Sequence, residues 1–504
     1  MDKVLDILLD THIIYLIPGF IFSVFSIGRY NLVISIFIWP FCFLTFLHKK
    51  ETKLMPLIVV YLLLLFSNMI RWIGITGLNI GADFIIGIYF SIINIIPFII
   101  DNIFYDKISK WKSALVFPLS VAISEFLFAF CPLANFNIYA FAVRENVQFL
   151  QIISLFGCYF LSFVIALFSS VLDYTINLYS EEKIISKFIF FYALIILFIY
   201  FFGLIRLLIP EEKGTYNIAS SIGMSQYLYT NDEESVLPIE EYINYINDTI
   251  IRAKYSNCSI MTYAEEAFAI MDTNRTDIIK QVKELAKNNK IFVLLPLDTC
   301  EDEEHNKNEA ILISDEGDIL YNYQKQHLIP YIEKDYYEDM GKVEVIDTTL
   351  GKITTVICYD INFPDFLNSL SREHFDLLLV PSWDWDGIAE FHSNEIRYKA
   401  IEGGFNVVKN TANGIVLSCD MKGRTLSYYI GKDCEDYFII NTVNKKGIKT
   451  LYSYIGFSFN YLYILALVCI LISGKINERF CSKDRRVSTF SNLQQLDEFY
   501  NNEY

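Results

Sequence analysis

One of the ten cysteines, Cys358, stands where a thiol could act as a nucleophile. It closes the β-branched run Ile353 to Ile357 and is followed by Tyr359, Asp360 and a Phe-Pro turn. Such a run predicts a buried strand, so a cysteine at its carboxyl end would be held rigidly at a turn. A free cysteine is more often a small core residue, and its thiol is mostly protonated at neutral pH. A nucleophilic role for Cys358 therefore requires a base and an oxyanion partner elsewhere in the chain.

Two further strand ends offer those groups. The strand-like segment SIMTY is followed by Glu265 and Glu266, and either carboxylate could take the proton from a thiol or belong to a solvated acidic loop. The strand-like segment YNYQ is followed by Lys325, which could stabilise a negative oxygen or be an ordinary surface lysine. Glutamate, lysine and cysteine follow predicted strands of one domain in that order. This arrangement favours a catalytic set over three unrelated residues.

The composition indicates a membrane protein with a soluble part. Of the 504 residues, 53% are hydrophobic, and the mean hydropathy is +0.34. The net charge of −17 leaves no basic surface for phosphates, so we expect no nucleic-acid partner. The cysteines show no CxxC pair or zinc-ligand spacing, and P-loop and GxGxxG motifs are missing from the sequence. The sequence therefore predicts neither a metal site nor a cofactor.

Apolar runs fill most of residues 12–209 and predict about seven transmembrane helices in a membrane domain, residues 1–212. Basic loops at residues 48–53, 106–112 and 183–187 alternate with loops that carry few cations. The positive-inside rule places these basic loops and the N-terminus in the cytoplasm. The expected spans lie near residues 12–28, 31–47, 54–74, 82–100, 114–131, 148–172 and 186–209.

A polar α/β domain follows the membrane domain. Strand-like and helix-like pieces alternate through residues 213–448, a length that suits one α/β domain. Residues 449–474 contain another apolar run, Leu451 to Ser473, and predict an eighth transmembrane helix. The tail, residues 475–504, begins with several basic residues and is expected in the cytoplasm. The basic loops of the membrane domain and the basic start of the tail both predict that the α/β domain is on the outer, non-cytoplasmic face.

The motifs around these residues resemble those of the carbon–nitrogen hydrolase (nitrilase) superfamily. The matching segments are YAEEA, KQHLIP and ICYDINFPD, and the resemblance continues through LLLVPSWDW and RYKAIEGG. It implies an αββα sandwich in which Glu265 is the general base, Lys325 the oxyanion stabiliser and Cys358 a nucleophile that forms a thioester. The motif register favours Glu265 over Glu266 as the base.

Within that superfamily the chain looks most like the apolipoprotein N-acyltransferases, which share its layout of seven spans, an outer nitrilase-like domain and an eighth span. The segment KQHLIPYIE resembles a motif of that branch and implies a further functional glutamate at Glu333. The same resemblance implies a supporting role for Tyr359. Glu125 matches a glutamate of the fifth span, and either a hydrogen bond between helices or a place near the substrate would explain it.

The sequence also departs from that branch. Tyr263 and Ala264 replace a Trp-Pro pair before the base, Asp360 replaces a glutamate, and the loop with Trp383 and Trp385 replaces an asparagine-rich one. The chemistry is therefore better defined than the substrate, and the roles of both tryptophans stay open.

Three functions fit these observations. The leading hypothesis is a membrane acyltransferase that moves a fatty acyl group from a phospholipid, through Cys358, to the N-terminal amine of a lipoprotein. The second is a membrane-anchored amidase that acts on an unknown amide, and the third is a transporter or inactive scaffold with a pseudo-enzyme domain. The presence of all three residue types of the catalytic set argues against the third.

Overall fold

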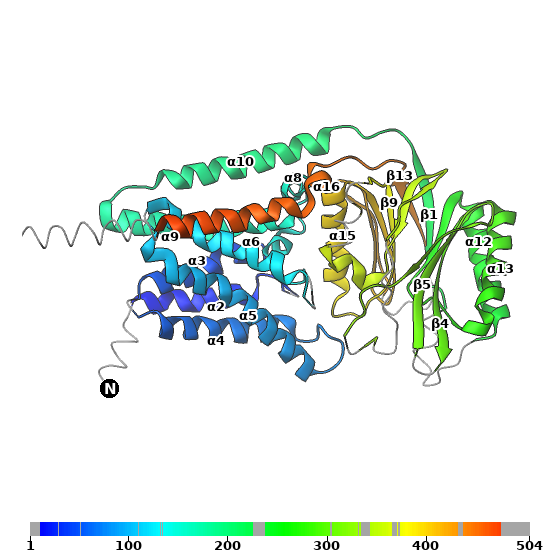
Figure 1. The fold of residues 1–504 in the computed structure, drawn as a ribbon, viewed down its shortest axis with the longest axis horizontal. Coiled ribbons are helices and arrows are strands. Elements are labelled where there is room, and N and C mark those ends of the chain that lie inside the picture. The colour runs from blue at the N-terminus through cyan, green and yellow to red at the C-terminus, as the bar shows by residue number, and fades with distance from the viewer. Residues whose placement is uncertain are drawn as a thin grey trace, which may run out of the picture.

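A helical bundle and an α/β sandwich lie end to end in the computed structural model (Figure 1). The structure describes residues 11–28, 30–50, 52–108, 110–131, 133, 135–224, 237–302, 305–330, 332–333, 343–364, 370, 373–431 and 437–474. The tail at residues 475–504, predicted to be cytoplasmic, lies outside these described residues.

The bundle is built from the apolar runs, which form helices because a helix satisfies its own backbone hydrogen bonds inside a bilayer. Six helices within the described part of the chain are long and apolar enough to cross a membrane. The first two expected spans fall on the shorter apolar helices Ile13–Val24 and Ser35–His48. The chain is therefore a multi-pass membrane protein, while the count of eight spans stays a prediction. The six long helices are Leu54–Trp72, Ile80–Lys107, Trp111–Phe128, Cys158–Glu182, Lys187–Leu208 and Leu451–Gly474.

The helices of this half differ in length. They are α2 (Leu16–Val24), α3 (Ser35–His48), α4 (Leu54–Trp72), α5 (Ile80–Phe104), α6 (Val116–Phe128), α7 (Val147–Leu150), α8 (Ile153–Phe156), α9 (Cys158–Glu182) and α10 (Lys187–Leu208), with the 3₁₀ helix η4 at Tyr139–Val143. The last membrane helix begins with α16 (Leu451–Ile455).

The apolar run expected to span near residues 148–172 is divided at Gly157. The short helices α7 and α8 precede this glycine, and the long helix α9 follows it. Gly157 has φ +79°, and a Cβ there would come within 2.4 Å of the Tyr452 ring. Only glycine tolerates both the positive φ and this close approach. The long helix is therefore Cys158–Glu182, shifted along the chain from the expected span.

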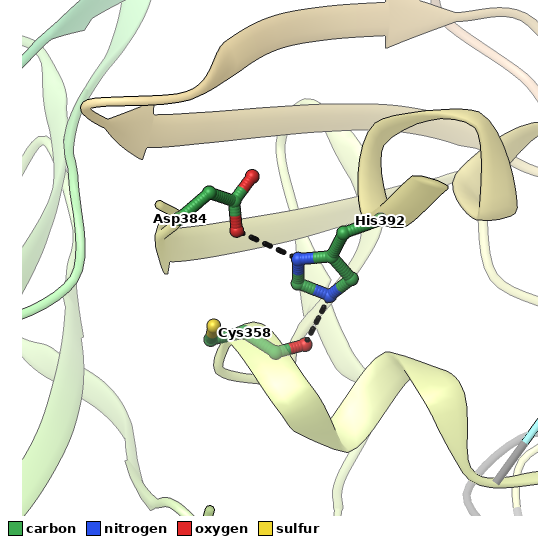
Figure 2. Close-up of side chains that lie close together, drawn as sticks. All are labelled: Cys358, Asp384 and His392. Atoms are coloured by element: carbon green, nitrogen blue, oxygen red, sulfur yellow. Dashed lines mark hydrogen bonds and ion pairs between the residues drawn. The ribbon is translucent and has the colours of Figure 1, made fainter. Parts of the chain in front are cut away.

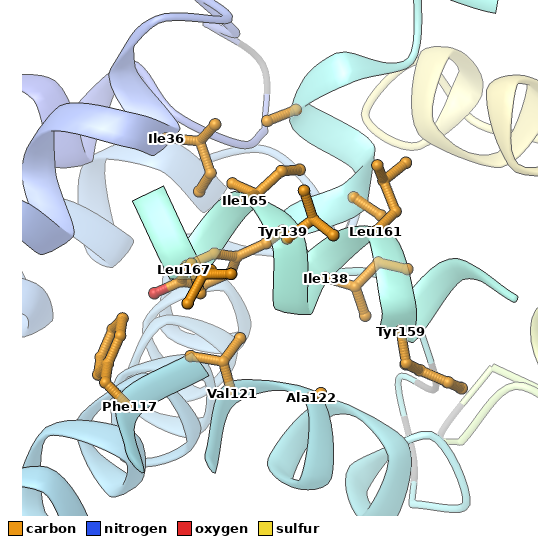
Figure 3. Close-up of a cluster of buried hydrophobic side chains, with 14 of the residues drawn as sticks. Ile36, Phe117, Val121, Ala122, Ile138, Tyr139, Tyr159, Leu161, Ile165 and Leu167 are labelled. Carbon is orange, nitrogen blue, oxygen red and sulfur yellow. The ribbon is translucent and has the colours of Figure 1, made fainter. Parts of the chain in front are cut away.

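The centre of the bundle encloses a stretch of irregular backbone around η4. Large apolar side chains surround it, as Figure 3 shows for a cluster from α3, α6, η4 and α9. Glu125 Oε1 accepts the Tyr139 N–H at 2.7 Å, at the start of η4. Irregular backbone at membrane depth needs such partners, because no water replaces the missing helical bonds. The contact favours the structural explanation of Glu125.

The α/β half is an αββα sandwich of two sheets. The first sheet has the order β13-β1-β2-β4-β5-β6 with β3 beside β4, and the second has the order β12-β11-β10-β9-β8-β7. Apolar side chains from both sheets form the core between them. The strands are β1 (Thr215–Ser221), β2 (Cys258–Tyr263), β3 (Phe268–Met271), β4 (Phe292–Asp302), β5 (His305–Ile313), β6 (Ile319–Gln324), β7 (Ile346–Thr348), β8 (Gly351–Thr355), β9 (Leu377–Trp383), β10 (Asn406–Ala412), β11 (Ile415–Cys419), β12 (Thr425–Ile430) and β13 (Phe438–Asn444).

Helices cover both outer faces of the sandwich. On the side away from the bundle lie α12 (Ile239–Tyr255) and α13 (Asp272–Asn289), and on the side facing the bundle lies α15 (Ala389–Gly403) (Figure 1). The apolar faces of α12 and α13 pack on the first sheet. The first and last strands, β1 and β13, pair antiparallel, so the chain enters and leaves the sandwich side by side.

Helix α15 is polar in sequence, yet every residue except Glu390 and Gly403 is buried. Its polar groups find partners in the bundle. The Tyr398 hydroxyl donates to the Ala140 carbonyl at 2.8 Å, and Glu402 Oε1 accepts the Cys158 N–H at 2.7 Å. Such pairing lets a polar helix lie between two apolar bodies, because buried polar groups cost free energy unless they are hydrogen-bonded.

Candidate active site

Four strand ends deliver polar side chains to one region between the sheets. Glu265 follows β2, Lys325 follows β6, and Asp384 follows β9. The strand before Cys358 is shorter than expected, since β8 ends at Thr355 and a 3₁₀ helix runs from Cys358 to Asn362. Different strands thus meet at one point, which allows residues far apart in sequence to act together.

Lys325 lies at the centre of a buried network, here called the Lys325 network and made of Lys325, Glu265, Glu266, Glu333 and Asn308. Its Nζ donates to Glu265 Oε1 at 2.8 Å and to Glu333 Oε1 at 2.5 Å. The Asn308 amide donates to Glu265 Oε1 at 2.7 Å and to Glu266 Oε1 at 3.2 Å. Burial alone would lower the pKa of Lys325, but Glu265 and Glu333 outweigh it and raise the pKa well above its usual value. The ammonium therefore stays charged.

The Lys325 network holds more carboxylates than ammonium groups. Oxygens of Glu265, Glu266 and Glu333 lie within 4.8 Å of one another, and all three residues are buried. Burial, followed by the neighbouring Asp298 and Glu265 carboxylates, raises the pKa of Glu266 well above its usual value. Because a buried excess of negative charge is costly, the protonated form of Glu266 is favoured.

Cys358 is buried beside this network in a conformation that L-residues rarely adopt. Its φ is +44°, in the left-handed region, and Cys358 is only 1% exposed to solvent. Its Sγ lies 3.8 Å from the Trp383 carbonyl oxygen, while the Trp383 N–H donates to Glu265 Oε2 at 2.7 Å. One residue thus contacts both thiol and carboxylate. Burial and the charge of Glu265 raise the pKa of the Cys358 thiol, and Lys325 partly offsets this rise. The thiol therefore needs a base to react.

Asp360 joins the Cys358 turn to the Lys325 turn. Its Oδ1 accepts the His327 N–H at 2.7 Å, and its Oδ2 accepts the Tyr323 hydroxyl at 2.7 Å. The Ile357 N–H also donates to Oδ2, at 3.3 Å. The aspartate that departs from the resembled motif therefore fixes the spacing between the nucleophile candidate and the lysine.

A second buried network lies on the other side of Cys358 and consists of Asp384, His392, Ser393 and Lys409; it is called the Asp384 network. His392 Nδ1 lies 2.7 Å from Asp384 Oδ1, and its Nε2 lies 3.2 Å from the Cys358 carbonyl oxygen (Figure 2). Lys409 Nζ donates to Asp384 Oδ2 and, at 3.2 Å, to Ser393 Oγ. Burial would raise the pKa of Asp384, but Lys409 and His392 lower it to about 2.

Comparison with known proteins places this geometry in a family. Residues 219–459 match the family model described as carbon-nitrogen hydrolase. The α/β domain is a carbon–nitrogen hydrolase domain. The whole chain resembles the apolipoprotein N-acyltransferase of Borreliella burgdorferi, with 24% identity over 83% of this chain and 86% of that protein. The carbon–nitrogen hydrolase match assigns the α/β domain to a superfamily of enzymes.

Two further proteins resemble the carbon–nitrogen hydrolase domain over part of their length. The deaminated glutathione amidase of Dictyostelium discoideum is 30% identical over 27% of this chain and 52% of that protein. The crystal structure of an amidase from Nesterenkonia sp. is 16% identical, has a TM-score of 0.40, and covers 48% of this chain and 94% of that one.

Tyr359 points from the carbon–nitrogen hydrolase domain into the bundle. Its hydroxyl accepts the Leu133 N–H at 3.0 Å, and its ring packs edge-on against Phe363 at 5.1 Å. Both rings belong to an apolar cluster that also contains Trp72 and Phe90 of the bundle. The residue next to Cys358 is thus part of the interface with the membrane helices.

Trp385 contributes to the same interface, and Trp383 lies inside the site. The Trp385 indole donates to the Ile75 carbonyl at 2.6 Å, and a Cβ at Gly77 would come within 2.8 Å of its ring. Trp383 contacts the site through its main chain, as described above. The two tryptophans therefore do different things, which their shared motif did not indicate.

Several polar residues of the site were missed in the sequence, Asn308 and His392 among them. Asn308 lies inside β5, and His392 lies at the start of α15. Neither belongs to a recognisable local motif, and the only available signal was a polar helix without an apolar face. The donor atoms that could hold a cation are used within the protein: Lys325 occupies the carboxylate cluster, and Lys409 and His392 engage Asp384.

Proposed function

We propose that this carbon–nitrogen hydrolase domain acts as a membrane acyltransferase. It would take a fatty acyl group from a phospholipid onto Cys358 and pass it to the N-terminal amine of a lipoprotein. The relative from Borreliella burgdorferi bears the name of that activity, and the match extends through the bundle as well as the α/β domain.

The observation that carries the proposal is the position of the candidate nucleophile beside the membrane helices. Tyr359 and Phe363 pack with Trp72, Phe90 and Phe136 in one apolar cluster. An acyl chain is apolar and favours such surroundings over water. A hydrolase for a small water-soluble amide gains nothing from a nucleophile turn packed into a membrane bundle.

The chemistry proceeds in two balanced halves. As Cys358 Sγ attacks the ester carbonyl, its proton passes to Glu265, and Lys325 stabilises the negative oxygen. The tetrahedral intermediate collapses to a thioester, and the proton on Glu265 leaves with the lysolipid hydroxyl. The acceptor amine then attacks the thioester, Glu265 takes its proton, and the amide forms as the thiolate is released and reprotonated.

Glu333 and Asp360 prepare the site for these steps. Glu333 Oε1 binds Lys325, while its Oε2 accepts the Ile329 N–H at 2.6 Å. With Glu265 on its other side, the Lys325 ammonium is held at a fixed point. A donor fixed in advance needs no reorganisation when charge develops in the transition state.

We also place this domain on the non-cytoplasmic face. Lys53 and Asp106 form an ion pair at 2.7 Å, so two of the basic loops lie together at one end of the bundle. Figure 1 shows α10 running from that far end of the bundle to the α/β domain. Cysteine labelling from each side of the membrane tests this orientation. Labelling of a cysteine at position 306 only from the cytoplasm would overturn it.

The decisive experiment is intact-protein mass spectrometry of purified enzyme incubated with phosphatidylethanolamine or phosphatidylglycerol. We expect a fatty-acyl increment on Cys358 that persists without an acceptor, because the thioester lies away from water. Adding a diacylated lipopeptide with a free N-terminus should discharge it. Cys358→Ala should abolish the increment, whereas Cys300→Ala, which removes a partly exposed thiol of the same domain, should retain it.

A hydrolase is the second candidate, favoured by the similarity to the deaminated glutathione amidase of Dictyostelium discoideum. The same enzyme preparation distinguishes the two. An acyl increment absent with both lipids, together with ammonia release from a simple amide, would replace the acyltransferase by an amidase.

A further inference from the structure

We propose that His392 is a positioning residue that holds the nucleophile turn by binding the main-chain carbonyl of Cys358. The inference rests on the proposed function in one respect, that Cys358 is the acylated residue. It does not depend on which acyl donor or acceptor the enzyme uses.

The contact that supports this role is the one with the backbone of Cys358. Figure 2 shows the His392 ring directed at the carbonyl oxygen of Cys358, with the sulfur on the opposite side of that residue. The Nε2 to carbonyl distance is 3.2 Å. Glu265 accepts the N–H of Trp383, the residue whose carbonyl oxygen contacts Sγ. His392 Nε2 thus lies within hydrogen-bond distance of the backbone of the nucleophile, while a ring nitrogen and Sγ are within 4.8 Å of each other.

The backbone at Cys358 requires such a restraint. A residue with φ +44° lies in the left-handed region, which L side chains adopt only when the surroundings impose it. The turn begins shortly after β8, which ends at Thr355, and Asp360 joins it to the segment of Lys325. A donor bonded to the Cys358 carbonyl fixes the peptide plane that follows the nucleophile and hence the direction of Sγ.

His392 is itself held in place. Its Nδ1 is within hydrogen-bond distance of the Asp384 carboxylate, which also forms an ion pair with Lys409. Asp384 and Lys409 are both less than 2% exposed. The ring is at the bundle-facing helix α15, the element between the sandwich and the membrane helices. A side chain with every polar atom partnered in a dry site has one orientation, as a positioning residue needs.

The hydrogen bonds of the His392 ring depend on pH because titratable and charged groups face it. These groups are Asp384 from the β9–α15 loop, Lys409 from β10 and the thiol of Cys358 from the 3₁₀ helix. The Asp384 carboxylate and the Cys358 carbonyl both accept, so the ring makes both bonds when both nitrogens carry protons. Burial and Lys409 lower the pKa of His392. The doubly protonated ring, favoured at acid pH, donates to both acceptors, whereas the neutral ring donates to one of them.

Two substitutions test separately the contacts of the His392 ring with Asp384 and with the Cys358 carbonyl. In His392→Gln the side-chain amide reaches the position of Nε2 and can donate to the Cys358 carbonyl. In His392→Asn the amide reaches only the position of Nδ1 and keeps the contact with Asp384. Asn394→Ala is the matched control, because it removes a hydrogen bond to the Glu390 carbonyl within α15 and lies outside the Asp384 network.

The experiment uses full-length enzyme in detergent and an activated p-nitrophenyl ester, which acylates a nucleophilic cysteine whatever the natural donor is. The first-order burst of nitrophenolate reports Cys358 acylation. We expect His392→Asn to slow the burst roughly 10–100-fold, the usual effect of removing a partner that orients a reactive group. His392→Gln and Asn394→Ala should stay near the wild-type rate. The ratio of wild-type to His392→Gln rates should fall as the pH rises.

The outcomes separate the two proposals. Equal slowing in His392→Gln and His392→Asn, with unchanged thermal midpoints, would show that the Cys358 carbonyl bond is not what matters and would overturn the inference. A burst in Cys358→Ala equal to the wild type would refute the assignment of the nucleophile itself. A burst with the ester but no increment from phospholipids would leave the role of His392 intact and overturn only the proposed donor.

Discussion

The two buried networks that flank Cys358 differ in how their charges balance. The Lys325 network sets one ammonium against three carboxylates within 4.8 Å of one another. The Asp384 network sets one carboxylate against an ammonium and a histidine ring. Burial favours a protonated carboxyl in the first network, whereas Lys409 and His392 keep the Asp384 carboxylate charged in the second. The first is therefore suited to proton movement and the second to fixed geometry.

This difference also gives the networks opposite dependence on pH. The Glu266 pKa is raised, so the folded protein binds a proton that the unfolded chain releases, and stability falls as the pH rises above the ordinary carboxyl range. The Asp384 pKa is lowered, so stability falls as the pH drops. A protein that carries both is most stable between the two ranges.

The largest expected effect is on stability, when the single cation of the Lys325 network is removed. Lys325→Met leaves the buried Glu265 and Glu333 carboxylates without their partner, which should cost about 3–5 kcal/mol in the free energy of unfolding at neutral pH. Adding Glu333→Gln should recover part of the loss. Chemical unfolding in detergent measures both. A single variant as stable as the wild type would show that the charges are not balanced in this way.

Turnover should distinguish the lysines of the two networks. Lys325→Met should slow Cys358 acylation about 10²–10³-fold, as for the loss of one oxyanion donor. Lys409→Met removes an equally buried lysine that forms an ion pair with Asp384. Its effect on acylation should be much smaller than that of Lys325→Met, because Lys409 touches no reacting atom. The p-nitrophenyl ester burst compares them directly. Equal losses in the two variants would remove the functional difference between the networks.

Acid should weaken the Asp384 network first. Its carboxyl has a pKa of about 2 in the folded protein, against about 3.9 for an ordinary aspartate. The difference contributes about 2 kcal/mol of stability that is present above about pH 4 and is lost as the pH falls towards 2. The thermal midpoint of the wild type should therefore fall more steeply over that range than that of Asp384→Asn. Parallel curves would contradict the assigned charge state.

The smallest effect is expected at Glu266. Because the protonated form of this carboxyl is favoured, Glu266→Gln should change stability at neutral pH by less than about 1 kcal/mol, the scale of one neutral hydrogen bond. It should also abolish the decline in stability above the ordinary carboxyl range. The paired variant Glu265→Gln should lose acylation instead. A loss of acylation in Glu266→Gln alone would make that residue the base.

Local motifs were sufficient to locate much of the site. Each of the four predicted residues stands in a short motif next to a strand signal. In the structure, Glu265 and Glu333 bind the Lys325 ammonium, and Cys358 and Glu265 both contact the main chain of Trp383. The β-branched run before Cys358 also marked its strand, although the strand ends earlier. Their catalytic roles stay predictions until the variants are measured.

Long-range contacts explain what the sequence did not reveal. His392 and Asn308 meet Cys358 and Glu265 only through the packing of sheets and of α15, and no periodicity encodes those contacts. The span expected near residues 148–172 was misplaced because Gly157 is required by the approach of Tyr452, a residue almost three hundred positions away. Hydropathy reports how apolar a segment is, but not where tertiary contacts divide it.

The pairing of β1 with β13 has a consequence for how the protein is made. The strand that completes the first sheet, Phe438–Asn444, is synthesised last in the domain, just before the chain turns into the final membrane helix at Leu451. Until then β1 presents an unpaired edge, the kind of surface that promotes aggregation. The ribosome therefore delivers the closing strand and the final membrane segment almost together. A transcript truncated shortly before residue 438 would yield a protein whose bundle is nearly complete and whose sandwich cannot close.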